Sequence, residues 1–126
     1  MRFGVYERRM TRTQTTDVEA LLQAIAEPTR LRLLALMLDG ETCVCDLTAA
    51  LRIPQPTASR HLARLRRAGL VSVRKEGLWC WYSIAPASGT AHAKLLECLA
   101  ACRAEMGELA TNSARCCALR DGRRCC

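Results

Sequence analysis

Cysteines are the side chains best suited to chemistry in this sequence, and nine of them occur in 126 residues. Cys43 and Cys45 are separated by one residue and precede a stretch with helical spacing. Side chains two residues apart point to one side of extended backbone but to different sides of a helix. Their sulfurs can therefore share one soft ion only where the backbone is not yet helical. A nearby helix N-terminus favours the thiolate form, although Asp46 as a candidate N-cap opposes this.

Two vicinal pairs near the C-terminus, Cys116 with Cys117 and Cys125 with Cys126, are further thiolate candidates. Each pair lies among arginines, which favour the reactive thiolate. Either could complete a site at Cys43 and Cys45, bind a methylated metalloid alone through two thiolates, or be incidental to a tail.

The other cysteines are better explained by packing. Cys98 and Cys102 share a helical face at i, i+4 and could chelate, and Cys80 is predicted to pack in a strand. An odd cysteine count with no apolar targeting segment argues against a secreted disulfide scaffold and predicts a reducing, cytoplasmic setting. No Cys-x-x-Cys pair is present, so a zinc finger is excluded.

Short helices are predicted to position these cysteines. Apolar spacing indicates helices over residues 17–26, 28–38, 46–52 and 56–68, then a β-hairpin over 71–84 and a last helix over 89–109. The fold class is therefore mainly α with a small β-hairpin, the α-α-α-α-β-β-α order of a winged helix-turn-helix. We expect a flexible segment over 1–15, one DNA-binding and dimerisation domain over 16–110, and a cysteine-rich tail over 111–126.

Positive charge is concentrated in the predicted helix-turn-helix and wing. Residues 52–76 hold seven basic side chains and one acid, a net of +6 in a chain of net +7. If Ala58, Leu62 and Leu65 face the core, the basic face of this helix points outward, either as an ordinary solvated face or toward DNA. The predicted DNA-binding residues are Gln55, Thr57, Ser59, Arg60 and His61 at or near bases, and Arg64, Arg67, Arg74 and Lys75 at phosphates.

Three strings in order carry a specific resemblance. Residues 26–34 (AEPTRLRLL), 59–65 (SRHLARL) and 68–71 (AGLV) resemble the ArsR/SmtB family of metal-responsive repressors over about residues 17–109. The resemblance implies a homodimer joined through its first and last helices, which binds double-stranded operator DNA.

Residues 43–47 (CVCDL) also resemble the family's arsenic signature, in which a cysteine follows the leucine as a third ligand. Here that position is Thr48, and a hydroxyl is a poor donor to a soft metalloid.

The sequence therefore predicts a repressor that leaves DNA when trivalent arsenic or antimony binds its thiolates. The predicted metal ligands are Cys43, Cys45, Cys116 and Cys117. A redox-switched repressor using disulfides remains the alternative. A zinc site on the last helix, where only His92, Glu97 and Glu105 are available, ranks lower. No apolar run is long enough to span a membrane. The sequence also has no phosphate loop and no motif for an organic cofactor, so an enzyme is not predicted.

Overall fold

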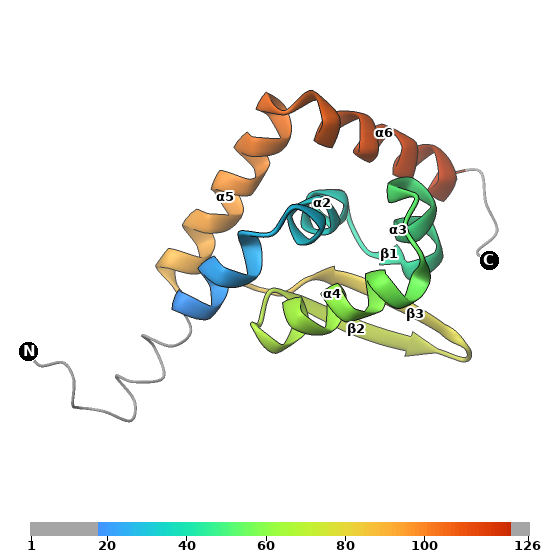
Figure 1. Cartoon of the computed structure of the whole chain (residues 1–126). Helices are drawn as coiled ribbons and strands as arrows, with labels where there is room; N and C mark the ends of the chain where they lie inside the picture. Colours follow the sequence, from blue (N-terminus) through green and yellow to red (C-terminus); the bar gives the residue numbers. More distant parts are fainter. Residues whose placement is uncertain (1–17, 122–126) are drawn as a thin grey trace, which may run out of the picture.

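Residues 18–121 are described by this computed structural model, which begins with a helix of residues 18–25. Helix α2 (Pro28–Met37) follows, and Glu27 caps it by accepting a hydrogen bond from the backbone N–H of Arg30 at 2.8 Å. Proline suits the first turn because its missing N–H would have no partner there. The predicted interruption at Glu27 and Pro28 is confirmed. Helix α2 lies at the centre of the molecule and buries the run from Leu33 to Met37 (Figure 1).

Helices α3 (Val44–Leu51) and α4 (Gln55–Arg67) form the helix-turn-helix. Arg52 ends α3 in the left-handed conformation with φ of 58°, which turns the chain toward α4. Ala58, Leu62 and Leu65 of α4 are fully buried, as their spacing predicts. One expectation is wrong: Asp46 is not the N-cap of α3, because the helix begins two residues earlier and Cys43 occupies the cap.

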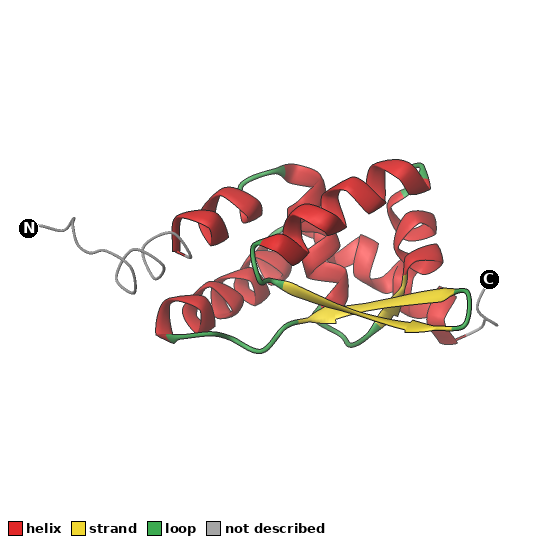
Figure 2. Cartoon of the chain, turned by 90° about the horizontal axis from the view of Figure 1, so that it is seen from below, coloured by secondary structure: helices red, strands yellow, loops and turns green. Residues whose placement is uncertain are grey.

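The wing is a hairpin of strands β2 (Val71–Glu76) and β3 (Trp79–Ile84), turned at Gly77 with a positive φ of 63°. A third strand, β1 (Thr42–Cys43), was not predicted. It pairs antiparallel with β3 so that Cys43 lies opposite Trp81, and the sheet order is β1-β3-β2. The hairpin projects beyond the helices at one side of the molecule (Figure 2). The predicted mainly α fold with a β-hairpin wing is confirmed, with one additional short strand.

Two helices follow the wing where one was predicted. Helix α5 (Thr90–Glu105) ends at Met106, which is extended, and α6 (Gly107–Asp121) continues at an angle. Together they form an arch around α2, and α6 passes over α2 and α3 (Figure 1). None of the described helices is long and apolar enough to cross a membrane.

Residues 111–121 differ from the expectation of a tail, because they are the larger part of α6. Leu109 and Cys116 are almost fully buried, and Cys116 belongs to the same hydrophobic cluster as Leu47 and Ala50 of α3. Two ion pairs tie the arch to the centre: Arg32 with Glu108 at 2.9 Å, and Arg103 with Asp39 at 2.9 Å. The packing of an apolar face on α2 and α3 explains why the helix continues. The predicted segment 1–15, with Cys125 and Cys126, lies outside the described residues.

Candidate DNA interface and cysteine site

Helix α4 presents a continuous basic face to solvent. Arg60, Arg64 and Arg67 are exposed, as are Gln55 and Ser59 near its N-terminus. Thr57 and His61 are partly buried at the edge of this face. The arginines and His61 also line a shallow hollow of about 380 Å³ together with Arg30. The structure thus brings the predicted recognition residues of α4 together on one accessible surface, where they can meet a polyanion.

The ring of His61 on α4 contacts Arg30 of α2 through Nδ1. Arg30 donates from its NH1 group to Nδ1 of His61 at 3.3 Å, and it also donates from Nε to the carbonyl oxygen of Ala24 at 2.6 Å. A carboxylate oxygen of Glu27 lies 3.8 Å from the same Nδ1. Arg30 is 9% exposed, so its guanidinium is a buried link between the helix of residues 18–25 and α4. Sequence reasoning missed Arg30, because its string was read only as a family motif.

The two basic residues of the wing differ in their surroundings. Arg74 donates to both carboxylate oxygens of Glu41, at 2.8 and 3.0 Å, and to Glu76 at 3.0 Å. Its guanidinium also lies 5.6 Å from the centre of the Trp81 ring. Hydrogen bonding from Arg74 lowers the pKa of the Glu41 carboxyl. Lys75 is exposed beside it. Arg74 is therefore already neutralised within the chain.

Cys43 and Cys45 lie where strand β1 passes into α3. Cys43 is fully buried at the end of β1, and its sulfur accepts a hydrogen bond from the backbone N–H of Cys45 at 3.4 Å. Cys45 is already in the first turn of α3, so the pair lies at the edge of the helix as predicted, but only Cys43 has the extended backbone that the spacing argument required. Thr48 donates from its hydroxyl to the carbonyl oxygen of Cys45 at 2.9 Å. The Thr48 hydroxyl is thus hydrogen-bonded to the backbone of α3.

The predicted pair on α6 divides between two environments. Cys116 is 1% exposed in the cluster that contains α3, and its neighbour Arg115 donates to the carbonyl oxygen of Ala50 at the end of α3. Cys117 points elsewhere, with its sulfur 3.7 Å from a carboxylate oxygen of Asp39. Of the two, only Cys116 lies against the helix that carries Cys45.

A complete three-donor site is not preassembled in the described part of the chain. Among residues 18–121, no three His, Cys, Asp or Glu side chains converge in a way that could hold a metal ion. Cys45 is disulfide-bonded in this structure. Thiolate ligation at this position therefore requires reduction of that bond.

Comparison with known proteins assigns the chain to a group of regulators. The profile of bacterial regulatory proteins of the arsR family matches residues 27–73, which span α2 to β2. The arsenical resistance operon repressor of Escherichia coli is 44% identical over 78 residues, which cover 61% of this chain and 67% of that protein. The chain belongs to the ArsR family. The arsenic resistance regulator ArsR1 of Pseudomonas putida is 45% identical over 67 residues, about half of each protein at 52%.

Two solved structures have the same fold. HlyU from Vibrio cholerae is 34% identical with a TM-score of 0.63, covering 72% of this chain and 96% of that one. A homodimeric winged helix-turn-helix DNA-binding domain from Mycobacterium bovis is 28% identical with a TM-score of 0.64, covering 80% and 91%. These matches confirm the predicted family and the winged helix-turn-helix fold, and they identify the chain as a transcription regulator instead of an enzyme.

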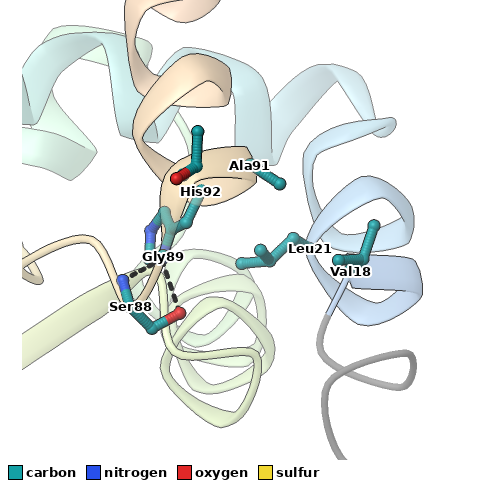
Figure 3. A pocket seen from close by; sticks show the side chains of 7 residues that line it. Val18, Leu21, Ser88, Gly89, Ala91 and His92 are labelled. Atoms are coloured by element: carbon teal, nitrogen blue, oxygen red, sulfur yellow. Dashed lines mark hydrogen bonds between the residues drawn. The ribbon is translucent and has the colours of Figure 1, made fainter. Parts of the chain in front are cut away.

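Within residues 18–121, the remaining candidates on α5 of this ArsR-family chain do not belong to any group of three donors that could hold a metal ion. His92 is 2% exposed, and its Nδ1 accepts a hydrogen bond from the backbone N–H of Ser88 at 3.0 Å, at the edge of a small cavity beside Leu21 (Figure 3). This contact ties His92, in the first turn of α5, to the backbone of the residue that precedes the N-cap Gly89. Cys98 is exposed and hydrogen-bonds with Cys102. Burial is the main cause of the raised pKa of the Cys102 thiol, and the neighbouring Cys98 raises it further.

Proposed function

We propose that this ArsR-family chain is a cytoplasmic, homodimeric repressor of a metalloid-resistance operon. In this proposal α4 and the wing bind operator DNA, and trivalent arsenic or antimony bound by thiolates releases it. The observation that carries the proposal is the position of Cys43 and Cys45 at the start of α3, the first helix of the helix-turn-helix. The arsenic-resistance names of its relatives from E. coli and P. putida support the choice of ligand.

Cys116 is the third donor that we favour, in place of Thr48. Cys116 belongs to a hydrophobic cluster that includes residues of α3, and Cys45 packs against the same cluster. Cys117 is less suitable because its sulfur faces Asp39. Sulfur is the soft donor that trivalent arsenic requires, and each new arsenic–sulfur bond replaces one hydroxyl of arsenous acid, which leaves as water with the thiol proton. Arsenite with three thiols thus gives a tris-thiolate and three waters, with no change of oxidation state.

Release follows from the need to assemble the site. Because the described residues hold no ready group of three donors, binding must draw the start of α3 and α6 together. A ligand shifts an equilibrium only through its different affinities for two states. The state with a complete thiolate site is favoured by the ligand, and in that state α3 is displaced from the position that supports α4. Strand β1 transmits the same displacement to the wing, since it pairs with β3.

The dimer is supported by apolar surface that this chain leaves exposed. Val18 and Leu22 of the first described helix are 39% and 50% exposed, and Met106 after α5 is 40% exposed. A second copy joined through the first helix and α5 would cover such side chains, in line with the family resemblance. Sedimentation at micromolar concentration should give the mass of a dimer, and a monomer would remove this part of the proposal.

Arsenite release is the decisive experiment. A DNA fragment selected from a random pool by the reduced protein is bound in phosphine reductant and titrated with arsenite. Cys43→Ser and Cys45→Ser should bind DNA normally but fail to release it, and Cys116→Ser should need much more arsenite. Cys117→Ser is the matched control and should behave as wild type. X-ray absorption should count three sulfur neighbours around arsenic in the wild type and two in Cys116→Ser.

Three outcomes would overturn the assignment. Normal release by Cys43→Ser and Cys45→Ser would place the inducer site elsewhere. Loss of response in Cys117→Ser but not in Cys116→Ser would reverse the choice of third donor. Release by peroxide but not by arsenite would favour the redox-switched alternative. Thermal melting of each variant shows whether a lost response is caused by loss of the fold.

A further inference from the structure

His61 contacts Arg30 through one ring nitrogen and lines the hollow on the basic face of α4. Its Nδ1 meets Arg30, and its side chain is 19% exposed. A guanidinium carries only N–H donors and cannot accept a hydrogen bond. The contact between Arg30 and Nδ1 at 3.3 Å is therefore formed only when Nδ1 carries no proton.

Glu27 does not reverse this assignment. Its carboxylate oxygen lies 3.8 Å from Nδ1, beyond hydrogen-bonding distance, whereas Arg30 is within it. The same carboxylate oxygen already accepts the backbone N–H of Arg30 at 2.8 Å. The neutral ring must then hold its proton on Nε2, the nitrogen on the other side of the ring from Arg30.

Arg30 is itself fixed in place. It donates to the carbonyl oxygens of Ala24 at 2.6 Å and Gln23 at 3.4 Å, which belong to the last turn of the helix of residues 18–25. Cations at a helix C-terminus are stabilised by the unpaired carbonyls there. One buried side chain thus joins this helix to α4.

We propose that Arg30 is a positioning residue that fixes His61 as the neutral tautomer with its proton on Nε2. In this form α4 offers DNA a hydrogen-bond donor at His61, suited to an acceptor such as guanine N7 or O6, or a phosphate oxygen. The inference rests on the proposed role of α4 as the recognition helix. It adds a specificity determinant that lies outside the DNA-facing surface of α4.

Nitrogen NMR of the histidine rings tests the tautomer without DNA. The chain has only two histidines, and His92, whose Nδ1 accepts from the backbone N–H of Ser88, serves as an internal standard. His61 should show the Nε2–H pattern at neutral pH, assigned with His61→Gln. An Nδ1–H pattern or an imidazolium in the wild type would overturn the proposal whether or not the protein binds DNA.

Arg30→Gln tests the positioning role, with Arg32→Gln as the matched control. Arg32 is on the same helix but donates to Glu108 instead, so its variant loses the same charge without touching His61. Arg30→Gln should lose the single tautomer and bind the selected DNA about tenfold more weakly. Arg32→Gln should retain both properties. An unchanged tautomer and affinity in Arg30→Gln would refute the positioning role.

Arg30→Lys covers the case in which Arg30→Gln fails to fold. Lysine retains the charge but has one nitrogen, so it cannot bond Ala24 and His61 in the same way, and the DNA affinity should still fall.

His61→Ala distinguishes the two possible acceptors on DNA. A loss of affinity confined to the selected fragment indicates a base, and an equal loss of affinity for random DNA indicates a phosphate. Both results support a donor at His61, while no loss on either DNA would refute it. A wild-type protein that binds no DNA would instead refute the proposed function.

Discussion

The salt dependence of DNA binding should show that Arg74 of the wing contributes less to phosphate binding than the arginines of α4. Arg64, Arg67 and Lys75 are exposed, whereas Arg74 is held by Glu41 and Glu76. Three phosphate contacts in each subunit of a dimer, at about 0.9 per phosphate, give a slope of log affinity against log salt of about −5. Arg64→Ala removes one contact from each subunit and should make the slope shallower by about 1.8.

Arg74→Gln is the informative comparison. Because Arg74 is already neutralised by carboxylates, the slope of this variant should remain within about 0.5 of the wild type. The slope is the quantity to compare, since the freed carboxylates can lower the affinity without changing the number of phosphates bound. Fluorescence anisotropy of a labelled fragment between roughly 50 and 200 mM salt measures it. Equal changes of slope in Arg64→Ala and Arg74→Gln would refute the reasoning.

Three other perturbations test the fold and its electrostatics. The Glu41 carboxyl should titrate below the usual value of about 4.3, so its pair with Arg74 is present at neutral pH and is lost only as the pH falls through the lowered pKa. NMR of that carbon measures this, and in Arg74→Gln the pKa should return to the usual value. Leu109→Ala removes a buried side chain at the start of α6 and should lower the unfolding free energy by about 2–5 kcal/mol in urea; a loss below about 1 kcal/mol would mean that α6 is not firmly packed. Iodoacetamide should modify exposed Cys98 before Cys102, whose thiol pKa is raised, and mass mapping that finds the reverse order would contradict the packing of α5.

Local patterns predicted the helix-turn-helix well. The spacing of Ala58, Leu62 and Leu65 repeats within one helix, so their burial could be predicted without knowledge of their partners. Strand β1 could not be predicted in this way, because two residues carry no periodicity and their pairing with β3 joins segments about forty positions apart. The pairing of Arg74 with Glu41 has the same non-local origin.

The missed helix α6 did leave a signal in the sequence. Leu109, Cys116 and Leu119 recur at helical spacing, but Cys116 was considered as a ligand and not as a core residue. Treating a cysteine as a small apolar side chain would have extended the helical pattern through this segment. The chemical interest of the cysteines concealed their contribution to packing.

The arch of α6 has a consequence for how the chain is synthesised. The matched segment 27–73 contains the whole helix-turn-helix, yet part of its core surface is covered by side chains of α6, which are synthesised after it. Domains generally fold as units while the chain emerges from its N-terminus. Here part of the apolar surface of α2 and α3 remains uncovered until Leu109 and Cys116 have been added. The core of the DNA-binding unit is therefore complete only after α6 has been synthesised.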